Sequence, residues 1–254
     1  MRALCLIRKE PYYRCAAFES GLKRVGFSLI SAGKAEGPED WLVIWNRHIH
    51  EAQADAWEAN GGTVIVAENG YLQKVDKTHY AISVHGHNGS GWFPVGDEDR
   101  FTALGFPVKA WRSDDRPGHE HPGYELVCGQ RGIGSRTMKS PPGWGERMAK
   151  KLEARGRRVK FRPHPGNFAP RVPLINDLAG AAAVHIWSSA AGVRAIVEGL
   201  PVYHSAPHWI GWGAGPMTQD IVLNRVAHAQ WHHEEIATGE PFARIIERRG
   251  EAVW

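Results

Sequence analysis

The sequence predicts an α/β protein built from two successive strand–helix units. Short apolar runs alternate with amphipathic stretches at helical spacing, the pattern of parallel strands joined by crossover helices. This alternation occurs twice, and a charged segment at 111–122, with two prolines and no periodicity, separates the two runs. We therefore expect two Rossmann-like α/β domains, at 1–118 and 119–254, that face each other across a cleft lined by the carboxyl ends of strands.

In the first half, each apolar run is followed by a helical or turn pattern. The helix expected at 13–25 has apolar residues at helical spacing and is followed by Gly26, a residue typical of helix C-termini. The helix expected at 50–60 is rich in alanine and is stopped by Gly61-Gly62. The expected elements, in order, are strand 3–7, helix 13–25, strand 41–45, helix 50–60, strand 63–67 and a further strand at 81–84.

The second half repeats the alternation after the irregular segment. An amphipathic helix at 144–155 is closed by Gly156, and the C-terminal stretch at 219–246 reads as helical, with one interruption at 239–241. The other expected elements are strands at 125–129, 159–162, 184–187 and 201–204 and helices at 174–181 and 190–198.

Composition places the chain among ordinary globular proteins. Hydrophobic residues make up 43% and charged residues 23% of the 254 positions. The net charge of +4 suits a phosphate-bearing partner but does not by itself indicate nucleic acid. Three widely spaced cysteines favour a reducing compartment, and no apolar run is long enough to span a membrane. We expect a cytoplasmic protein, in the host cytoplasm if a phage encodes it, without membrane insertion.

The strand expected at 159–162 runs into an Arg162-Pro163-His164-Pro165 turn. The prolines on both sides of His164 restrict the backbone and remove amide donors, so the turn is stiff. An arginine can grip two phosphate oxygens, and a histidine can donate a hydrogen bond or a proton. We therefore predict Arg162 and His164 as phosphate ligands; the alternative is that His164 caps a loop carbonyl.

Ser188 and Ser189 precede Ala190-Ala191-Gly192, a favourable start for a helix. A serine at this place satisfies unpaired helix amides, and the same amides and hydroxyls can hold a phosphate. We predict Ser188, Ser189 and Gly192 as part of a donor site and expect the two hydroxyls to converge with His164 on one anion.

A glycine-containing loop follows the strand expected at 125–129. Glycines there allow backbone amides to approach a ligand, and an arginine adds positive charge. The loop matches neither a Walker nor a Rossmann motif. The candidate donor ligands in it are Gln130, Arg131, Gly134 and Ser135.

The His-Pro motif, the later Ser-Ser helix start and the Gly199-Leu200-Pro201-Val202 segment resemble the donor domain of GT-B type glycosyltransferases. The similarity covers 123–202 and is nearest to bacterial capsule-polysaccharide, sialyltransferase-like and polyol-phosphate transferase enzymes. It implies a nucleotide-sugar donor (UDP- or another NDP- or CMP-sugar) whose phosphate contacts His164, Ser188 and Ser189. Many GT-B enzymes hold the ribose with a glutamate where this chain has Arg194, which could instead stack on a base or contact a phosphate.

Transfer to a hydroxyl needs a general base. Glu68 follows the strand expected at 63–67 and is the first candidate, ahead of Asp97, Asp99, Asp114 and Asp115; capping a turn is its alternative role. His85, His87 and Trp92 lie in a glycine-rich loop and are candidates for acceptor contacts. The His-x-His pairs lack accompanying cysteines or carboxylates at ligand spacing, so no metal is predicted.

The leading function is therefore transfer of a sugar from a nucleotide-sugar to a hydroxyl acceptor. The small size and basic balance also resemble phage enzymes that glycosylate hydroxymethylated pyrimidines in DNA. DNA and glycan acceptors both stay open, with DNA favoured because membrane-anchoring features are missing. The alternatives are a capsule-type sugar or polyol-phosphate transferase and a non-catalytic binder of nucleotides or nucleic acid.

Overall fold

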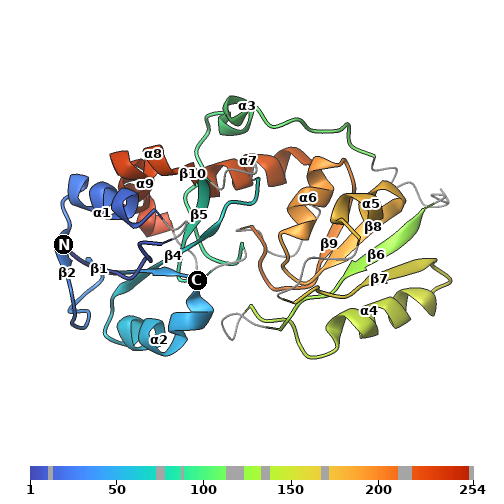
Figure 1. Cartoon of the computed structure of the whole chain (residues 1–254), viewed down its shortest axis with the longest axis horizontal. Helices are drawn as coiled ribbons and strands as arrows, with labels where there is room; N and C mark the ends of the chain where they lie inside the picture. The colour runs from blue at the N-terminus through green and yellow to red at the C-terminus, as the bar shows by residue number, and fades with distance from the viewer. Residues whose placement is uncertain are drawn as a thin grey trace.

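The chain forms a mixed α/β structure with two separate, largely parallel sheets, each flanked by helices (Figure 1). The six-stranded sheet has the order β10-β5-β4-β3-β1-β2, and the four-stranded sheet has the order β7-β6-β8-β9. The expected α/β class is confirmed. The computed structural model describes residues 1–10, 14–72, 78–86, 89–112, 123–132, 138–166, 172–210 and 219–251.

In the first sheet, β1 to β4 are parallel, whereas β5 pairs antiparallel with β4 and β10 pairs antiparallel with β5. The connection from β4 to β5 is too short for a crossover helix, which needs about a dozen residues, so the chain returns antiparallel. The strands are β1 (Arg2–Cys5), β2 (Ser28–Ile30), β3 (Asp40–Trp45), β4 (Thr63–Asn69), β5 (His79–Val84) and β10 (Gln230–His232).

Both faces of this sheet are covered. Along β3 the side chains alternate between two apolar clusters, with Trp41 and Val43 in one and Leu42 and Ile44 in the other. All six residues of β3 are buried, which explains its unbroken apolar sequence. The covering helices are α1 (Cys15–Arg24), α8 (His233–Thr238) and α9 (Glu240–Arg248) on one face and α2 (Glu51–Ala59), preceded by η1 (Arg47–His50), on the other.

The second sheet is wholly parallel. One face packs on α4 through Val127 and Phe161, and the other carries Leu126, Val184 and Val202 into the largest apolar cluster. The elements are β6 (Tyr124–Cys128), α4 (Trp144–Glu153), β7 (Val159–Arg162), α5 (Leu174–Ala179), β8 (Ala181–Ile186), α6 (Ala191–Val197) and β9 (Val202–His204).

The C-terminal segment departs from the expected run of helices. Helix α7 (Gln219–Ala229) leads into β10, which joins the first sheet, so the helical prediction was wrong for these three residues. An interruption was expected at 239–241; the structure has it at Gly239 (φ 88°) alone, and Glu240 and Pro241 already belong to α9. Helix α8 packs on α1 where Gly21 lacks a side chain; a Cβ there would lie 2.0 Å from the carbonyl oxygen of Ile236. Four other short elements were not predicted: β2, η1, α3 (Arg100–Leu104) and η2 (Arg249–Glu251), which closes the described chain.

The two sheets lie side by side, α7 runs along the upper part of the view from β10 toward α6, and β1 and β6 start at opposite outer edges and run toward the middle (Figure 1). Leu72 and Phe93 from the first half share an apolar cluster with Val184 and Val193 from the second. The boundary expected at 118/119 lies outside the described residues. None of the helices in the described part combines the length and apolar character that a bilayer crossing requires.

Candidate functional site

A pocket of about 620 Å³ lies where the carboxyl ends of β6 and β7 meet the amino end of α4. Ligands of parallel α/β sheets commonly bind outside the carboxyl ends of the strands, so its place in the fold is the expected one. Its lining combines segments rich in glycine and proline with charged side chains. The lining residues are Gly129, Gln130, Arg131, Gly132, Lys139, Ser140, Pro141, Pro142, Gly143, Trp144, Gly145, Glu146, Phe161, Pro163 and His164.

Two glycines let α4 begin against the strand ends. A Cβ on Gly145 would lie 2.6 Å from a ring carbon of Phe161 and 3.4 Å from the Cα of Gly129. A Cβ on Gly129 would itself meet Phe161 at 3.3 Å. The first turn of α4 therefore starts beside the strand ends. The N–H of Trp144 already donates to the carbonyl of Pro141 at 3.0 Å. The N–H groups of Gly145 and Glu146, which lack acceptors within the helix, and the positive end of the helix dipole favour an anion there.

His164 lies exposed at this pocket, and its Nδ1 accepts the backbone N–H of Gly166 at 2.9 Å. An imidazole that accepts at Nδ1 carries its proton on Nε2, so the ring is a neutral donor. Partial loss of hydration and the nearby Arg131 cation lower the pKa of His164, which keeps the ring neutral at physiological pH. The residue can thus offer one N–H to a bound anion.

Three further charged side chains line the pocket: Arg131, Lys139 and Glu146. The two cations add their positive charge to that of the helix amino end. The carboxylate can instead accept hydrogen bonds from hydroxyl donors such as those of a sugar or ribose. Lys139 and Glu146 were missed in the sequence analysis. The signal for them was Pro141-Pro142-Gly143 directly before an amphipathic helix, which places the flanking residues at a helix start.

Gln130 connects the pocket to the end of β8. Its Oε1 accepts the backbone N–H of Ser188 at 2.6 Å, and its Nε2 donates to the hydroxyl of Ser188 at 3.4 Å. Ser188 is fully buried. Its hydroxyl therefore helps to position a pocket residue, and Ser188 does not itself line the pocket that contains His164.

Arg162 lies away from the pocket. Side chains alternate along β7, so Phe161 faces α4 while Lys160 and Arg162 contact Asp177 of α5 on the opposite face. Asp177 is buried, which opposes its ionisation, but the two cations outweigh this and lower its pKa. Arg162 thus compensates the negative charge of the buried Asp177 carboxylate.

Three further donor candidates, Ser189, Gly192 and Arg194, also lie outside the pocket lining. The hydroxyl of Ser189 accepts the backbone N–H of Ala191 at 3.2 Å, as a residue at a helix start does. Gly192 is buried, and a Cβ there would lie 2.7 Å from Trp209. Arg194 is exposed and lies 3.4 Å from Glu198. Five candidates fall outside the described residues: His87, Asp114, Asp115, Gly134 and Ser135.

Glu68 is 9% exposed near the end of β4 and accepts a hydrogen bond from the hydroxyl of Tyr71 at 2.7 Å. Burial, followed by the nearby Glu68 charge, raises the pKa of Tyr71 well above 10, so this hydroxyl stays protonated and donates. Leu72, next to Tyr71, is held by Gln230, whose side-chain amide accepts from the N–H of Leu72 at 2.7 Å and donates to its carbonyl at 2.9 Å. The contacts of Tyr71 and Leu72 thereby help to orient the Glu68 carboxylate.

The ring of His85 contacts Glu58, and its carbonyl accepts from Arg47 at 2.7 Å. Burial opposes the ionisation of Glu58, but hydrogen bonds from Arg47 and then His85 outweigh it and lower the pKa of Glu58 to about 2. His85 has a left-handed backbone (φ 64°), which these contacts hold in place. Trp92 pairs through its backbone with Val84. Neither residue lines the pocket beside His164.

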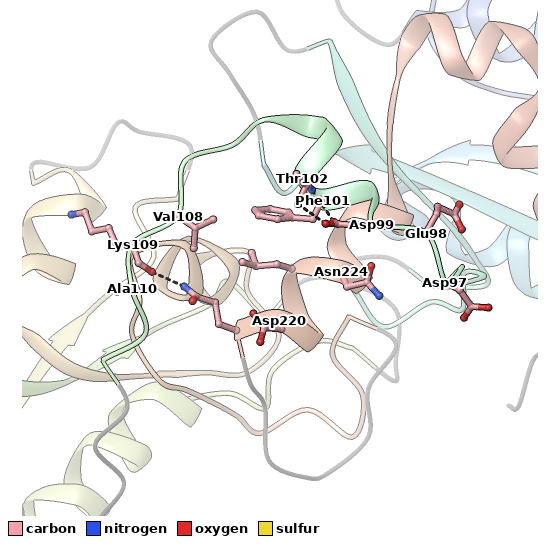
Figure 2. A pocket seen from close by; sticks show the side chains of 12 residues that line it. Asp97, Glu98, Asp99, Phe101, Thr102, Val108, Lys109, Ala110, Asp220 and Asn224 are labelled. Carbon is pink, nitrogen blue, oxygen red and sulfur yellow. Dashed lines mark hydrogen bonds between the residues drawn. The ribbon is translucent and has the colours of Figure 1, made fainter.

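A second pocket, of about 580 Å³, lies between α3, the segment at 108–110 and α7 (Figure 2). Asp97 and Asp99 line it, and Asp99 accepts the N–H of Thr102 at 3.0 Å as the cap of α3. Neither these two alternatives nor Glu68 itself lines the pocket that contains His164. Within the described ranges, no group of three or more His, Cys, Asp or Glu residues is arranged to hold a metal ion.

No protein-family model and no curated protein matches the sequence. Among solved structures, the chain resembles Thermosulfurimonas dismutans KpsC, a beta Kdo 2,7 transferase, with a TM-score of 0.49 and 13% sequence identity. The similarity covers 95% of this chain and 98% of that chain.

Proposed function

We propose that the chain is a glycosyltransferase that binds the diphosphate of a nucleotide-sugar in the pocket beside His164. The observation that carries the proposal is the combination of the amino end of α4 with Arg131, Lys139 and the donor Nε2–H of His164 in one pocket. Helix amino ends and cations together form anion sites. A volume of about 620 Å³ has room for a nucleotide as well as its phosphates.

In the proposed reaction, an acceptor hydroxyl attacks the anomeric carbon of the bound sugar. The bond from that carbon to the diphosphate oxygen breaks, and the electron pair leaves with the diphosphate. His164 and the cations stabilise the charge that develops on this leaving group. Glu68 takes the proton of the acceptor hydroxyl, with Tyr71 orienting the carboxylate. Glu146 accepts hydrogen bonds from sugar or ribose hydroxyls, in place of the glutamate that Arg194 replaces.

The two sheets, in this proposal, form the facing domains of a GT-B arrangement, with donor and acceptor on opposite sides. The proposed acceptor is the hydroxymethyl group of a modified pyrimidine in DNA. The net charge of +4 suits a phosphate-bearing acceptor, although this charge does not by itself select DNA.

The test is a transfer assay with a panel of nucleotide-sugars and two acceptors, a hydroxymethylcytosine-containing duplex and an oligosaccharide, read by mass spectrometry. The expected product is DNA heavier by one glycosyl unit. Transfer to the oligosaccharide alone would keep the reaction and overturn the acceptor. Donor binding without transfer or donor hydrolysis would overturn the reaction itself and leave a nucleotide-binding protein.

A further inference from the structure

The pocket beside His164 contains a serine hydroxyl that the proposed reaction does not use. Ser140 is only 6% exposed, and it lines this pocket. Among the described residues nothing forms a hydrogen bond with its Oγ, and yet this atom is not sealed from solvent. Most buried side-chain polar groups have a partner, because an unpaired one is costly. The hydroxyl of Ser140 is therefore open to a ligand in the pocket.

The neighbouring neutral polar side chains are already engaged. Gln130 lines the same pocket, but both ends of its amide contact Ser188, at 2.6 Å and 3.4 Å. Ser188 and Ser189 do not line the pocket, and the hydroxyl of Ser189 accepts the backbone N–H of Ala191 at 3.2 Å. Of the three serines, Ser140 is thus the one whose hydroxyl a ligand in this pocket can reach.

The position of Ser140 is held by its surroundings. Two residues before it, the carbonyl of Met138 accepts the indole N–H of Trp187 at 2.9 Å. Ser140 also packs against Gly132, where an added Cβ would lie 3.3 Å from the Ser140 carbonyl oxygen and 3.9 Å from its hydroxyl. A group that is already held in place loses little conformational freedom when a ligand binds.

The segment between Ser140 and α4 has few donors of its own. Pro141 and Pro142 have no N–H group. The N–H of Trp144 is already used by the carbonyl of Pro141. The hydroxyl of Ser140 therefore supplies a donor to a stretch of the pocket wall from which two amide donors are missing.

We propose that the hydroxyl of Ser140 donates a hydrogen bond to a phosphate oxygen of the donor, an assignment that rests on the proposed function. The adjacent residues in the pocket are cationic, since Lys139 precedes Ser140 and Arg131 precedes Gly132. These charges attract the most anionic part of a nucleotide-sugar, which is its diphosphate. A hydrogen bond to a charged oxygen is also stronger than one to a neutral group.

The experiment measures, by calorimetry, the Kd of two probes. One is inorganic pyrophosphate, and the other is whichever of ADP, CDP, GDP and UDP the unmodified chain binds most tightly. Ser140→Ala is expected to bind both probes about tenfold more weakly, the low end for a hydrogen bond to a charged group. Ser140→Cys nearly keeps the side-chain volume but donates poorly, so it should show nearly the same loss. The control is Ser28→Ala, at an exposed position in β2, which should bind as the unmodified chain does.

The two probes locate the contact. A loss confined to the nucleoside diphosphate would place the hydroxyl on the sugar or base and overturn the assignment. Equal affinities of Ser140→Ala and the unmodified chain would also overturn it, and so would full affinity in Ser140→Cys, because the side chain would then act by filling space. If the unmodified chain bound neither probe, the donor site itself would be overturned, so the two failures are distinguishable.

Discussion

Replacing Glu68 by glutamine is expected to lower kcat by about 10²- to 10⁴-fold, the usual contribution of a general base. Glutamine has nearly the same shape and keeps an oxygen that can accept the hydroxyl of Tyr71 at the position seen here, 2.7 Å away. The fold and the donor affinity should therefore persist. Initial rates at saturating donor, together with the Kd of the nucleotide by calorimetry, measure the two effects separately.

The control for this variant is Glu10→Gln, which makes the same chemical change at an exposed position. Its rate should equal that of the unmodified protein. If Glu68→Gln kept full activity, another group would have to take the proton. A loss of donor affinity with unchanged kcat would place Glu68 in binding instead.

Replacing His164 by alanine is expected to weaken transition-state binding by about 1.5–3 kcal/mol, the range for a hydrogen bond to a charged group. This corresponds to a decrease of about 10- to 150-fold in kcat/KM. His164→Gln supplies a neutral N–H donor of similar reach and should recover part of the loss. His48→Ala, at an exposed position in η1, is the control and should behave as the unmodified chain. Identical kcat/KM in His164→Ala would contradict the role given to this ring.

The strands were well predicted because buried parallel strands are continuous apolar runs. Such a run marks β3, where all six residues are buried, and β8, where five of six are. Strand β10 was not predicted because its three residues owe their conformation to pairing with β5, nearly 150 residues earlier in the chain. Apolar periodicity within a short window contains no information about such a partner.

In the candidate site, too, the features set by local sequence were predicted and those set by distant partners were not. The stiff turn at His164 and the loop at Gln130 follow from local features, and both line the pocket. The pairing of Arg162 with Asp177 depends on which face of β7 meets α5, and the contact of Gln130 with Ser188 joins residues 58 positions apart. Tertiary packing determines these partners. For this reason residue type alone predicted Arg162 and Ser188 as donor ligands, whereas in the structure they contact other residues of the chain.

A crystal structure of the chain with a bound nucleoside diphosphate would show whether the diphosphate of the donor binds beside His164. We expect both phosphates within hydrogen-bond reach of His164, Arg131 and the first-turn amides of α4. A diphosphate bound at Ser188 and Ser189, or anywhere else with this pocket left without it, would overturn the proposed donor site.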